Sequence, residues 1–170
     1  MDFSTAFIAL RDRMADAMQK DFVNRVNYEI GGRMAALYGS FGVTSERKLL
    51  GLVGLGNSGH AHEYRALFAA PSLDAQAMED WWQYALSLEK QLVEPDRDHV
   101  FSIVSIILVT DGLEKPLQKQ LRKLNQERQF DGEAQAGWSS IRFAVADLGS
   151  RKVFSNRFGE PLKKVVAAWL

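Results

Sequence analysis

Residues 54–59, GLGNSG, have the spacing of a dinucleotide-binding loop, whose glycines let the backbone approach a pyrophosphate. Such a loop follows a parallel strand, and an acidic residue about 20 positions later ends a second strand and binds the ribose. Here the preceding residues, SERKLLGLV, begin like a capped helix, and the acids at that distance fall in a helical pattern. We therefore interpret the glycines as a break between two helices and expect no bound cofactor.

His60 and His62 are the candidates for a metal site, since imidazole is a common zinc ligand. On a helix, side chains two positions apart point about 200° from each other and cannot hold one ion. In a strand or a loop the two rings can converge, and an acidic residue from elsewhere in the chain would complete the ligand set. Surface histidines without a ligand are the simpler interpretation.

Asp111 follows the apolar run HVFSIVSIILVT, which is rich in β-branched residues and predicts a buried central strand. Acidic residues after such strands often carry the chemistry of α/β sheets. Asp111 and Glu114 also have the spacing of a capping box, and we favour that role. Asp147 is most simply a turn residue, but it could pair with Asp111 as acid and base if the strand ends converge. A metal-dependent hydrolase using Asp111 with His60 or His62 is a further hypothesis.

Several chemistries are excluded by composition. The chain has no cysteine, so it has no disulfides, thiolate ligands or cysteine nucleophile, which fits a reducing compartment. The Gly-x-Ser-x-Gly and His-Glu-x-x-His motifs are also missing from the sequence. The longest apolar run, residues 100–109, is too short to cross a bilayer as a helix, which takes about 20 residues. We expect a cytoplasmic protein without membrane contact, and we lean towards a role other than catalysis.

Basic residues are concentrated in the last third of the chain. Residues 113–170 contain eleven Lys or Arg against six Asp or Glu, although the whole chain has a net charge of zero. Aromatic residues lie among them, and basic groups with exposed aromatic rings can bind nucleic acid. A basic face over residues 115–164 is therefore one functional hypothesis, although solvated charges explain the pattern more simply. The candidate residues are Lys115, Lys119, Arg122, Lys123, Arg151 and Lys152.

The spacing of apolar residues predicts the elements that would position these groups. Over residues 3–38 they recur every three or four positions, which predicts a long helix that is bent or broken at Gly31-Gly32. Further helices are expected over 44–53, from Ser58 to about 70, and over 73–93. Residues 1–96 are thus expected to form a helical region of four or five helices.

The pattern changes near residue 98. A strand is expected over 99–110, a helix over 113–124, two hairpin strands over 138–159 that turn at 147–150, and a closing helix over 160–170. Residues 97–170 are therefore expected to form a small β-α-β-β-α unit. The predicted fold class is α+β, with both regions packed into one compact domain.

The leading functional hypothesis is a non-catalytic protein-interaction or regulatory module. It rests on the lack of a complete catalytic set and on the long apolar stripe of residues 3–38. Such a stripe needs a covering surface, so we expect self-association or a protein partner at residues 3–38. Nucleic-acid binding and metal-dependent hydrolysis are the alternatives.

Overall fold

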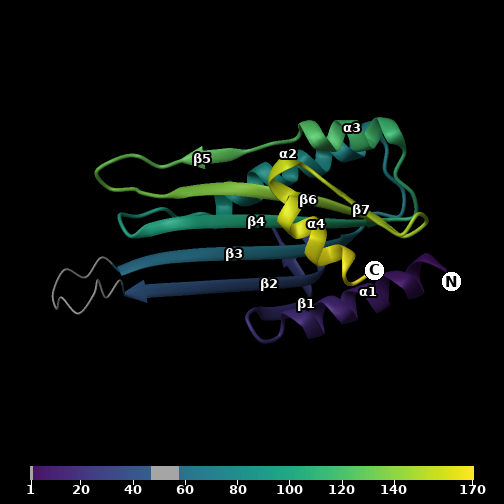
Figure 1. The fold of residues 1–170 in the computed structure, drawn as a ribbon, viewed down its shortest axis with the longest axis horizontal. Coiled ribbons are helices and arrows are strands. Elements are labelled where there is room, and N and C mark those ends of the chain that lie inside the picture. Colours follow the sequence, from purple (N-terminus) through teal and green to yellow (C-terminus); the bar gives the residue numbers. More distant parts are fainter. Residues whose placement is uncertain (1, 47–57) are drawn as a thin grey trace.

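The computed structural model describes residues 2–46 and 58–170 of the chain (Figure 1). A mixed sheet runs the length of the molecule. Its strand order is β1-β2-β3-β4-β6-β5, and β7 pairs with β6. The strands are β1 (Val23–Ile30), β2 (Arg33–Glu46), β3 (Ser58–Ala69), β4 (His99–Thr110), β5 (Glu127–Gln129), β6 (Trp138–Asp147) and β7 (Lys152–Ser155). The helices are α1 (Phe3–Met18), α2 (Ala75–Leu92), α3 (Lys115–Lys123) and α4 (Glu160–Ala167), and a short 3₁₀ turn (Arg157–Gly159) precedes α4.

The sheet combines two patterns of strand pairing. β1, β2 and β3 form an antiparallel meander, whereas β3, β4 and β6 are parallel neighbours. α2 connects β3 to β4, and α3 with β5 connects β4 to β6. β5 and β7 both pair antiparallel with β6, at its beginning and its end respectively.

The expected helical front half is wrong. α1 ends at Met18, and the chain then forms the antiparallel hairpin β1–β2. The apolar spacing of three and four residues continues through this hairpin, which is why it resembled a helix. The β-branched and aromatic residues of VNRVNYEI favour a strand, and Gly31 and Gly32 have φ of 58° and 80°. Two consecutive residues with positive φ form the tight turn that joins twisted antiparallel strands, so this glycine pair closes a hairpin.

The second expected helix of this region is also a strand. Residues 58–69 form β3, in which Tyr64, Ala66 and Phe68 alternate into one core, the period of a strand. Thr44, the first residue of the helix expected over 44–53, lies in β2. The rest of that expected helix and most of the glycine motif lie within residues 47–57, outside the described residues. Ser58 and Gly59 begin β3, so a described strand follows the motif.

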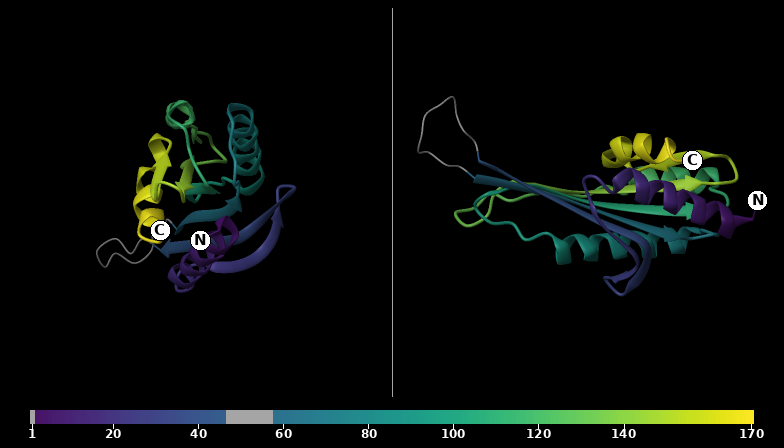
Figure 2. Two further views of the ribbon diagram at one scale, coloured as in Figure 1. Left: turned by 90° about the vertical axis from the view of Figure 1, so that its right-hand side faces the viewer. Right: turned by 90° about the horizontal axis from the view of Figure 1, so that it is seen from below.

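Helices cover both faces of the sheet (Figure 2). α2 and α3 pack on one face through Met78, Trp82, Leu117 and Leu121, which form one core with the sheet. α1 and α4 pack on the other face, where a second core is formed. Its helical members are Phe7, Leu10, Met14, Met18, Leu162 and Val166. The apolar stripe of α1 is therefore buried against its own sheet.

The chain after residue 98 forms no separate small unit, in contrast to the expectation. It contributes β4, α3, β6, β7 and α4, but β4 continues the sheet by pairing with β3. The two regions expected on either side of residue 96 therefore share one sheet. Among the helices that the structure describes, none combines the length and the apolar character needed to cross a membrane.

Candidate functional site

The carboxyl ends of β4 and β6 lie side by side, with Thr110 opposite Asp147. After β4 the chain turns to α3 on one face of the sheet, and after β6 it passes through β7 to α4 on the other face. Parallel neighbours whose connections leave towards opposite faces have a crevice between their ends, where open α/β sheets bind ligands. In Figure 1 these ends lie at the right-hand side, near the beginning of α1.

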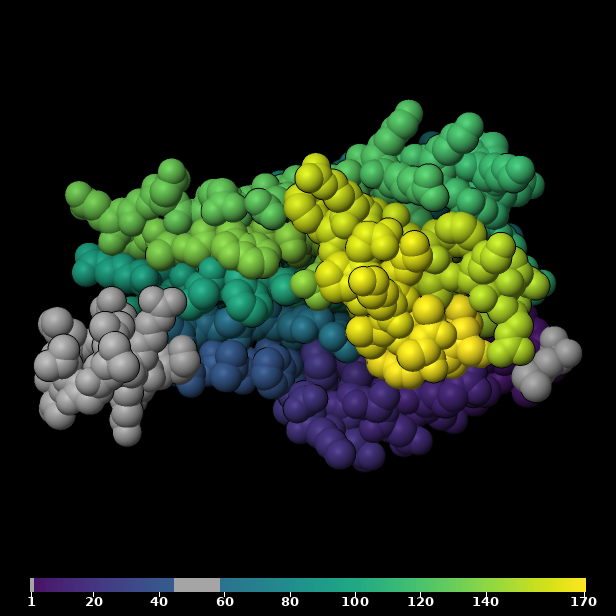
Figure 3. Space-filling view, viewed as in Figure 1, coloured from purple at the N-terminus to yellow at the C-terminus, as the bar shows by residue number. Residues whose placement is uncertain are grey.

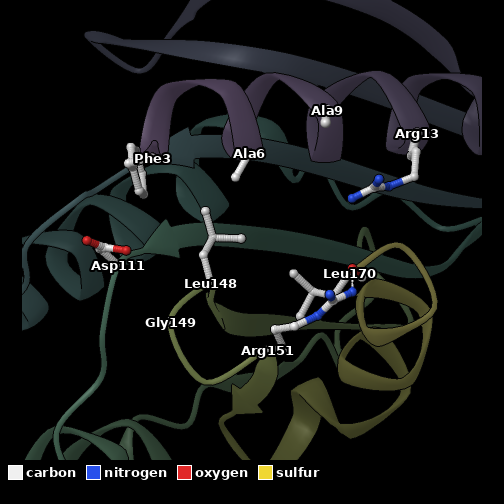
Figure 4. Close-up of a pocket in the computed structure, with 9 residues that line it drawn as sticks. All are labelled: Phe3, Ala6, Ala9, Arg13, Asp111, Leu148, Gly149, Arg151 and Leu170. Atoms are coloured by element: carbon white, nitrogen blue, oxygen red, sulfur yellow. Dashed lines mark hydrogen bonds between the residues drawn. The ribbon is translucent and has the colours of Figure 1, made fainter. Parts of the chain in front are cut away.

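A pocket of about 410 Å³ opens at this position. Its apolar wall comes from Phe3, Ala6 and Ala9 of α1 and from Leu148, which follows β6. The remaining lining residues are Arg13, Asp111, Gly149, Arg151 and Leu170. Figure 4 shows Asp111 beside Phe3 at one end of the pocket, and Arg13 and Arg151 towards the other. The pocket thus combines an apolar wall with opposite charges at its two ends.

The turn after β6 is held tightly against the end of β4. A Cβ atom on Gly149 would collide with the carbonyl oxygen of Asp111, so no larger residue fits without moving the backbone. Arg151 has a φ of 53°, and its Nη2 donates a hydrogen bond to the backbone oxygen of Leu170 at 2.8 Å. The positions of Asp111 and Arg151 at the pocket are therefore fixed by this turn.

Asp147 is a structural acceptor in the turn. Its Oδ2 accepts from the N–H of Leu113 at 3.1 Å, and its Oδ1 accepts from the N–H of Ser150 at 3.0 Å. Burial raises the pKa of Asp147, but hydrogen bonds from Ser150, Leu113 and Gly149 outweigh it, and the net pKa lies below the usual value. The carboxylate therefore stays ionised near neutral pH, which suits an acceptor better than a general acid.

The capping box expected at Asp111 is not formed. α3 begins at Lys115, its N-cap residue is Glu114, and no side chain caps it. Pro116 sets this later start, because proline fits the first turn of a helix. The N–H of Leu113 bonds to Asp147 instead. Asp111 is exposed and lines the pocket.

The three histidines gather at the other end of the parallel strands. The ring centroids of His60 and His62 are 5.0 Å apart, and those of His60 and His99 are 5.6 Å apart. His60 Nε2 donates to Oδ1 of Asp96 at 2.8 Å, because a carboxylate can only accept. Nδ1 of His60 also lies within hydrogen-bonding distance of Nε2 of His62, at 2.9 Å, and the tautomers of the two rings decide which nitrogen donates. The nitrogens of His60 and His62 face each other rather than a common ion.

Ser102 and His99 have the hydrogen bonding of a base-activated hydroxyl. His99 Nδ1 donates to the carbonyl of Ala136 at 2.8 Å, and its Nε2 accepts from Oγ of Ser102 at 2.8 Å. Both side chains are buried, with 3% and 1% exposed, and their polar atoms are already paired with each other and with Ala136, so this pair has the character of a structural contact. Sequence reasoning missed this pair because residues three apart on a regular strand point to opposite faces. Here the register shifts from His60–His99 to Ala61–Phe101, so β4 has an extra residue, Val100, between His99 and Ser102.

The structure does not bring Asp111 to the histidines. They lie at opposite ends of β4, and a strand rises about 3.3 Å per residue, so roughly 35 Å separate them. Within residues 2–46 and 58–170, no group of three or more His, Asp or Glu is arranged to hold a metal ion. Asp111 and Asp147 do lie at neighbouring strand ends, but the carboxylate of Asp147 is taken up by backbone N–H groups.

The six basic candidate residues are all exposed but lie in two places. α3 carries Lys115, Lys119, Arg122 and Lys123 on the side away from Leu117 and Leu121, which enter the core shared with α2. Arg151 and Lys152 lie at the turn into β7, where Arg151 lines the pocket beside α1. The six residues therefore come from two elements, α3 and the turn into β7.

Comparison with protein families gives one match. A model described as "Domain of unknown function (DUF8052)" matches residues 8–168, and the chain therefore belongs to this family. No curated protein and no solved structure matches the chain. The family description names no activity, so the function is argued from the geometry.

Proposed function

We propose that this member of the DUF8052 family is a non-catalytic binding protein, and that its pocket holds a small molecule with a carboxylate group and an apolar body. The observation that carries the proposal is the place of the pocket, between parallel strand ends whose connections leave to opposite faces. Its volume of about 410 Å³ lies within the range of small-molecule sites. The hydroxyl of Ser102 is buried, which supports binding rather than nucleophilic catalysis.

The charges around the pocket indicate the chemistry of the ligand. Arg13 and Arg151 at one end suit a carboxylate, because guanidinium groups form charge-assisted hydrogen bonds with it. Asp111 at the other end suits an ammonium or hydroxyl group, and the wall of Phe3 and Leu148 suits an apolar side chain between them. An apolar amino acid or hydroxy acid combines these three features.

Thermal-shift and calorimetric titrations test this proposal with phenylalanine, phenyllactate and phenylacetate. We expect phenylalanine to bind best, since only its ammonium group can pair with Asp111. Arg13→Gln removes one cation and should weaken binding about tenfold, the equivalent of one charged hydrogen bond. Arg11→Gln on the same helix is the control, because Arg11 pairs with Asp12 and does not line the pocket. Equal losses in both variants, or no binding of any probe, would contradict the proposal.

We propose self-association through residues 3–38 as a second property, with β1 as the contact. β1 is the last strand at one end of the sheet order, and Val23 and Val26 on it are 65% and 53% exposed. An edge strand offers unpaired backbone groups to another strand. β1 carries both Arg25 and Glu29, so an antiparallel arrangement of two copies can bring unlike charges together.

Sedimentation velocity at tens of micromolar tests this contact. The wild-type chain should sediment as a dimer, and Val26→Lys should shift it to a monomer because it places a charge in the contact. Val100→Lys on β4 is the matched control, since Val100 is also exposed, at 40%, but lies away from β1. A monomeric wild-type protein at this concentration would rule out the dimer.

Nucleic-acid binding remains a further candidate function, favoured by the exposure of all four basic residues of α3. Basic side chains that neutralise phosphates give an affinity that falls with salt. Titration of labelled RNA and DNA at low and moderate salt should then show salt-sensitive binding that Lys119→Gln weakens.

We also propose a cytoplasmic location, which the lack of cysteine supports.

A further inference from the structure

Three polar residues form a row across the middle of the parallel strands. Arg65 on β3 is in register with Ser105 on β4, and Ser105 is in register with Arg142 on β6. Residues directly opposite each other in a sheet point to the same face. Two positions further along each strand, Leu67, Ile107 and Ala144 enter the core under α1 and α4. The row therefore points to the face of the sheet that α1 and α4 cover, and it lies next to the core on that face.

The helices cover only part of this face. Figure 3 shows α4 in yellow over the right-hand part of the sheet and α1 in purple below it, whereas β3, β4 and β6 are visible to the left of α4. Arg65 and Arg142 are partly exposed, so their side chains lie at the border between the covered and the open part. A small molecule can therefore approach the row from solvent.

Arg65 is held in place by its neighbours. Its Nε donates to Oε1 of Glu63 at 2.8 Å, and its guanidinium lies 4.6 Å from the ring centroid of Phe22. Glu63 offsets one of the two positive charges, which leaves the group formed by Glu63, Arg65 and Arg142 with a net charge of +1.

Arg142 has no such partner: it forms no ion pair with any residue of the described ranges. Burial lowers its pKa, the charge of Glu63 raises it and that of Arg65 lowers it, with a net decrease. Burial is the largest of these effects, so an anion that approaches Arg142 from the open part of the face would compensate for the lost hydration of its guanidinium group.

Ser105 supplies the second, independent observation. Its side chain is fully buried between the two arginines in the row, and its Oγ has no hydrogen-bond partner among residues 2–46 and 58–170. A buried hydroxyl without a partner costs about 1–3 kcal/mol, so such groups are rarely left unpaired in folded proteins. A hydroxyl donor flanked by two guanidinium groups matches the acceptor oxygens of a tetrahedral oxyanion.

We propose that Arg65, Ser105 and Arg142 form a binding site for a phosphate group. In this site the hydroxyl of Ser105 donates one hydrogen bond to the phosphate, and the guanidinium groups of Arg142 and Arg65 bind it from the two sides. The site is distinct from the pocket at the strand ends, because Ser105 precedes Asp111 by six residues and lies in the middle of the sheet.

The phosphate has two possible sources, the free ion and a phosphorylated molecule with an aromatic ring. Phe101 and Trp138 lie on the same face as the row, four residues earlier on β4 and β6, and are stacked with their ring centroids 5.3 Å apart. Four residues of a strand span about 13 Å, so an extended ligand could reach from this pair to the arginines. Aromatic pairs on a sheet surface can stack on a nucleotide base.

Isothermal titration with inorganic phosphate and with ATP tests the site. Arg142→Met removes a charged donor and should weaken phosphate binding at least tenfold, and Ser105→Ala should weaken it about tenfold. Arg157→Met is the control, because Arg157 is exposed and lies outside the row. Tighter binding of ATP than of phosphate, lost in Trp138→Leu, would identify a nucleotide, and equal binding would identify the free ion.

The unfolding temperature without ligand separates this role from a structural one. Ser105→Ala removes an unpaired buried polar atom, so the unliganded variant should be as stable as the wild type or more stable. Weaker phosphate binding in a fully folded Ser105→Ala protein is the result expected for a ligand-binding hydroxyl. Failure of both probes to bind, or equal affinity in Arg142→Met and the wild type, would overturn the proposal.

Discussion

The carboxylate of Asp147 joins two loops through hydrogen bonds to Leu113 and Ser150. These loops carry Asp111 and Gly149, so the shape of the pocket depends on one side chain that does not line it. Such a residue positions the site without touching a ligand.

Asp147→Asn should destabilise the fold by about 1–3 kcal/mol, because one amide N–H₂ would face a backbone N–H donor in place of an acceptor. Equilibrium denaturation in urea measures this loss. Asp111→Asn is the control: Asp111 is exposed, and we expect a change within about 0.5 kcal/mol. A loss of equal size in both variants would show that Asp147 has no special structural role.

His62 makes the stability depend on pH. Burial lowers its pKa, and the charges of His60 and His99 lower it further. The unfolded chain takes up this proton near pH 6.5, whereas the folded chain resists it to lower pH. The contribution of His62 is therefore complete above pH 6.5 and is lost as the pH falls towards the lower folded pKa.

We therefore expect the free energy of unfolding to decrease from pH 7.5 to pH 5.5, and to decrease less in His62→Gln. Chemical denaturation at each pH measures both slopes. Identical slopes in the two proteins would mean that His62 does not cause the dependence.

At the scale of elements, the hairpin β1–β2 is anchored to α2. The hydroxyl of Tyr84 donates to the carbonyl of Ile30 at 2.7 Å, and the guanidinium of Arg33 lies 3.9 Å from the ring centroid of Trp81. A Cβ atom on Gly31 would lie 3.1 Å from Cε2 of Tyr84. The turn of the hairpin thus packs closely on the helix that connects β3 and β4.

The variants Gly31→Ala and Gly32→Ala separate two requirements of this turn, a positive φ and close packing against α2. Both residues have positive φ, which costs an L-residue about 1–2 kcal/mol. Only Gly31 also packs against Tyr84, since no atom of the described part of the chain lies within 4 Å of a Cβ on Gly32. Gly31→Ala should therefore be the more destabilising in thermal unfolding, and equal losses would show that only the backbone conformation matters.

The elements differ in how far the sequence predicts them. Local signals suffice for α2, which begins after the capping residue Asp74, and for β4, whose β-branched run is buried on both sides. They fail over residues 23–46 and 58–69, because apolar residues three or four apart fit a helix and a twisted strand alike. A glycine pair in the middle was the better signal, since Gly31-Gly32 is compatible with a tight turn and costly in a helix.

The sites are harder to predict than the elements. Asp111 was found because it follows a recognisable strand. The row of Arg65, Ser105 and Arg142 depends on the register of three strands that are far apart in the sequence, and no local pattern encodes this register. The convergence of the three histidines has the same origin, because His99 comes from a different strand than His60 and His62.

At the scale of the whole molecule, the side chain of Glu89 connects α2 to β5 and β6 through hydrogen bonds. It is 1% exposed on α2, and its Oε1 accepts from Nε of Arg128 on β5 at 2.9 Å and from Oγ of Ser139 on β6. A buried carboxylate is tolerated when such partners compensate for its lost hydration.

Arg128→Met would leave the buried carboxylate of Glu89 without its cation. We expect a loss of about 3 kcal/mol in equilibrium denaturation, near the lower end of the range for breaking a buried ion pair. The double variant with Glu89→Met should recover part of this loss, because it buries no charge. If the double variant is less stable than Arg128→Met, the ion pair is not the cause.

The parallel pairing of β3 with β4 also affects how the chain folds as it is synthesised. β3 can join the meander with β1 and β2 as soon as it leaves the ribosome, but its second edge has no partner until α2 and all of β4 have followed. During that interval the edge of β3 that will pair with β4 has no hydrogen-bond partner. Such unpaired strand edges are surfaces through which newly made proteins aggregate or bind chaperones. Slowing translation before residue 99 should therefore lower the yield of folded protein.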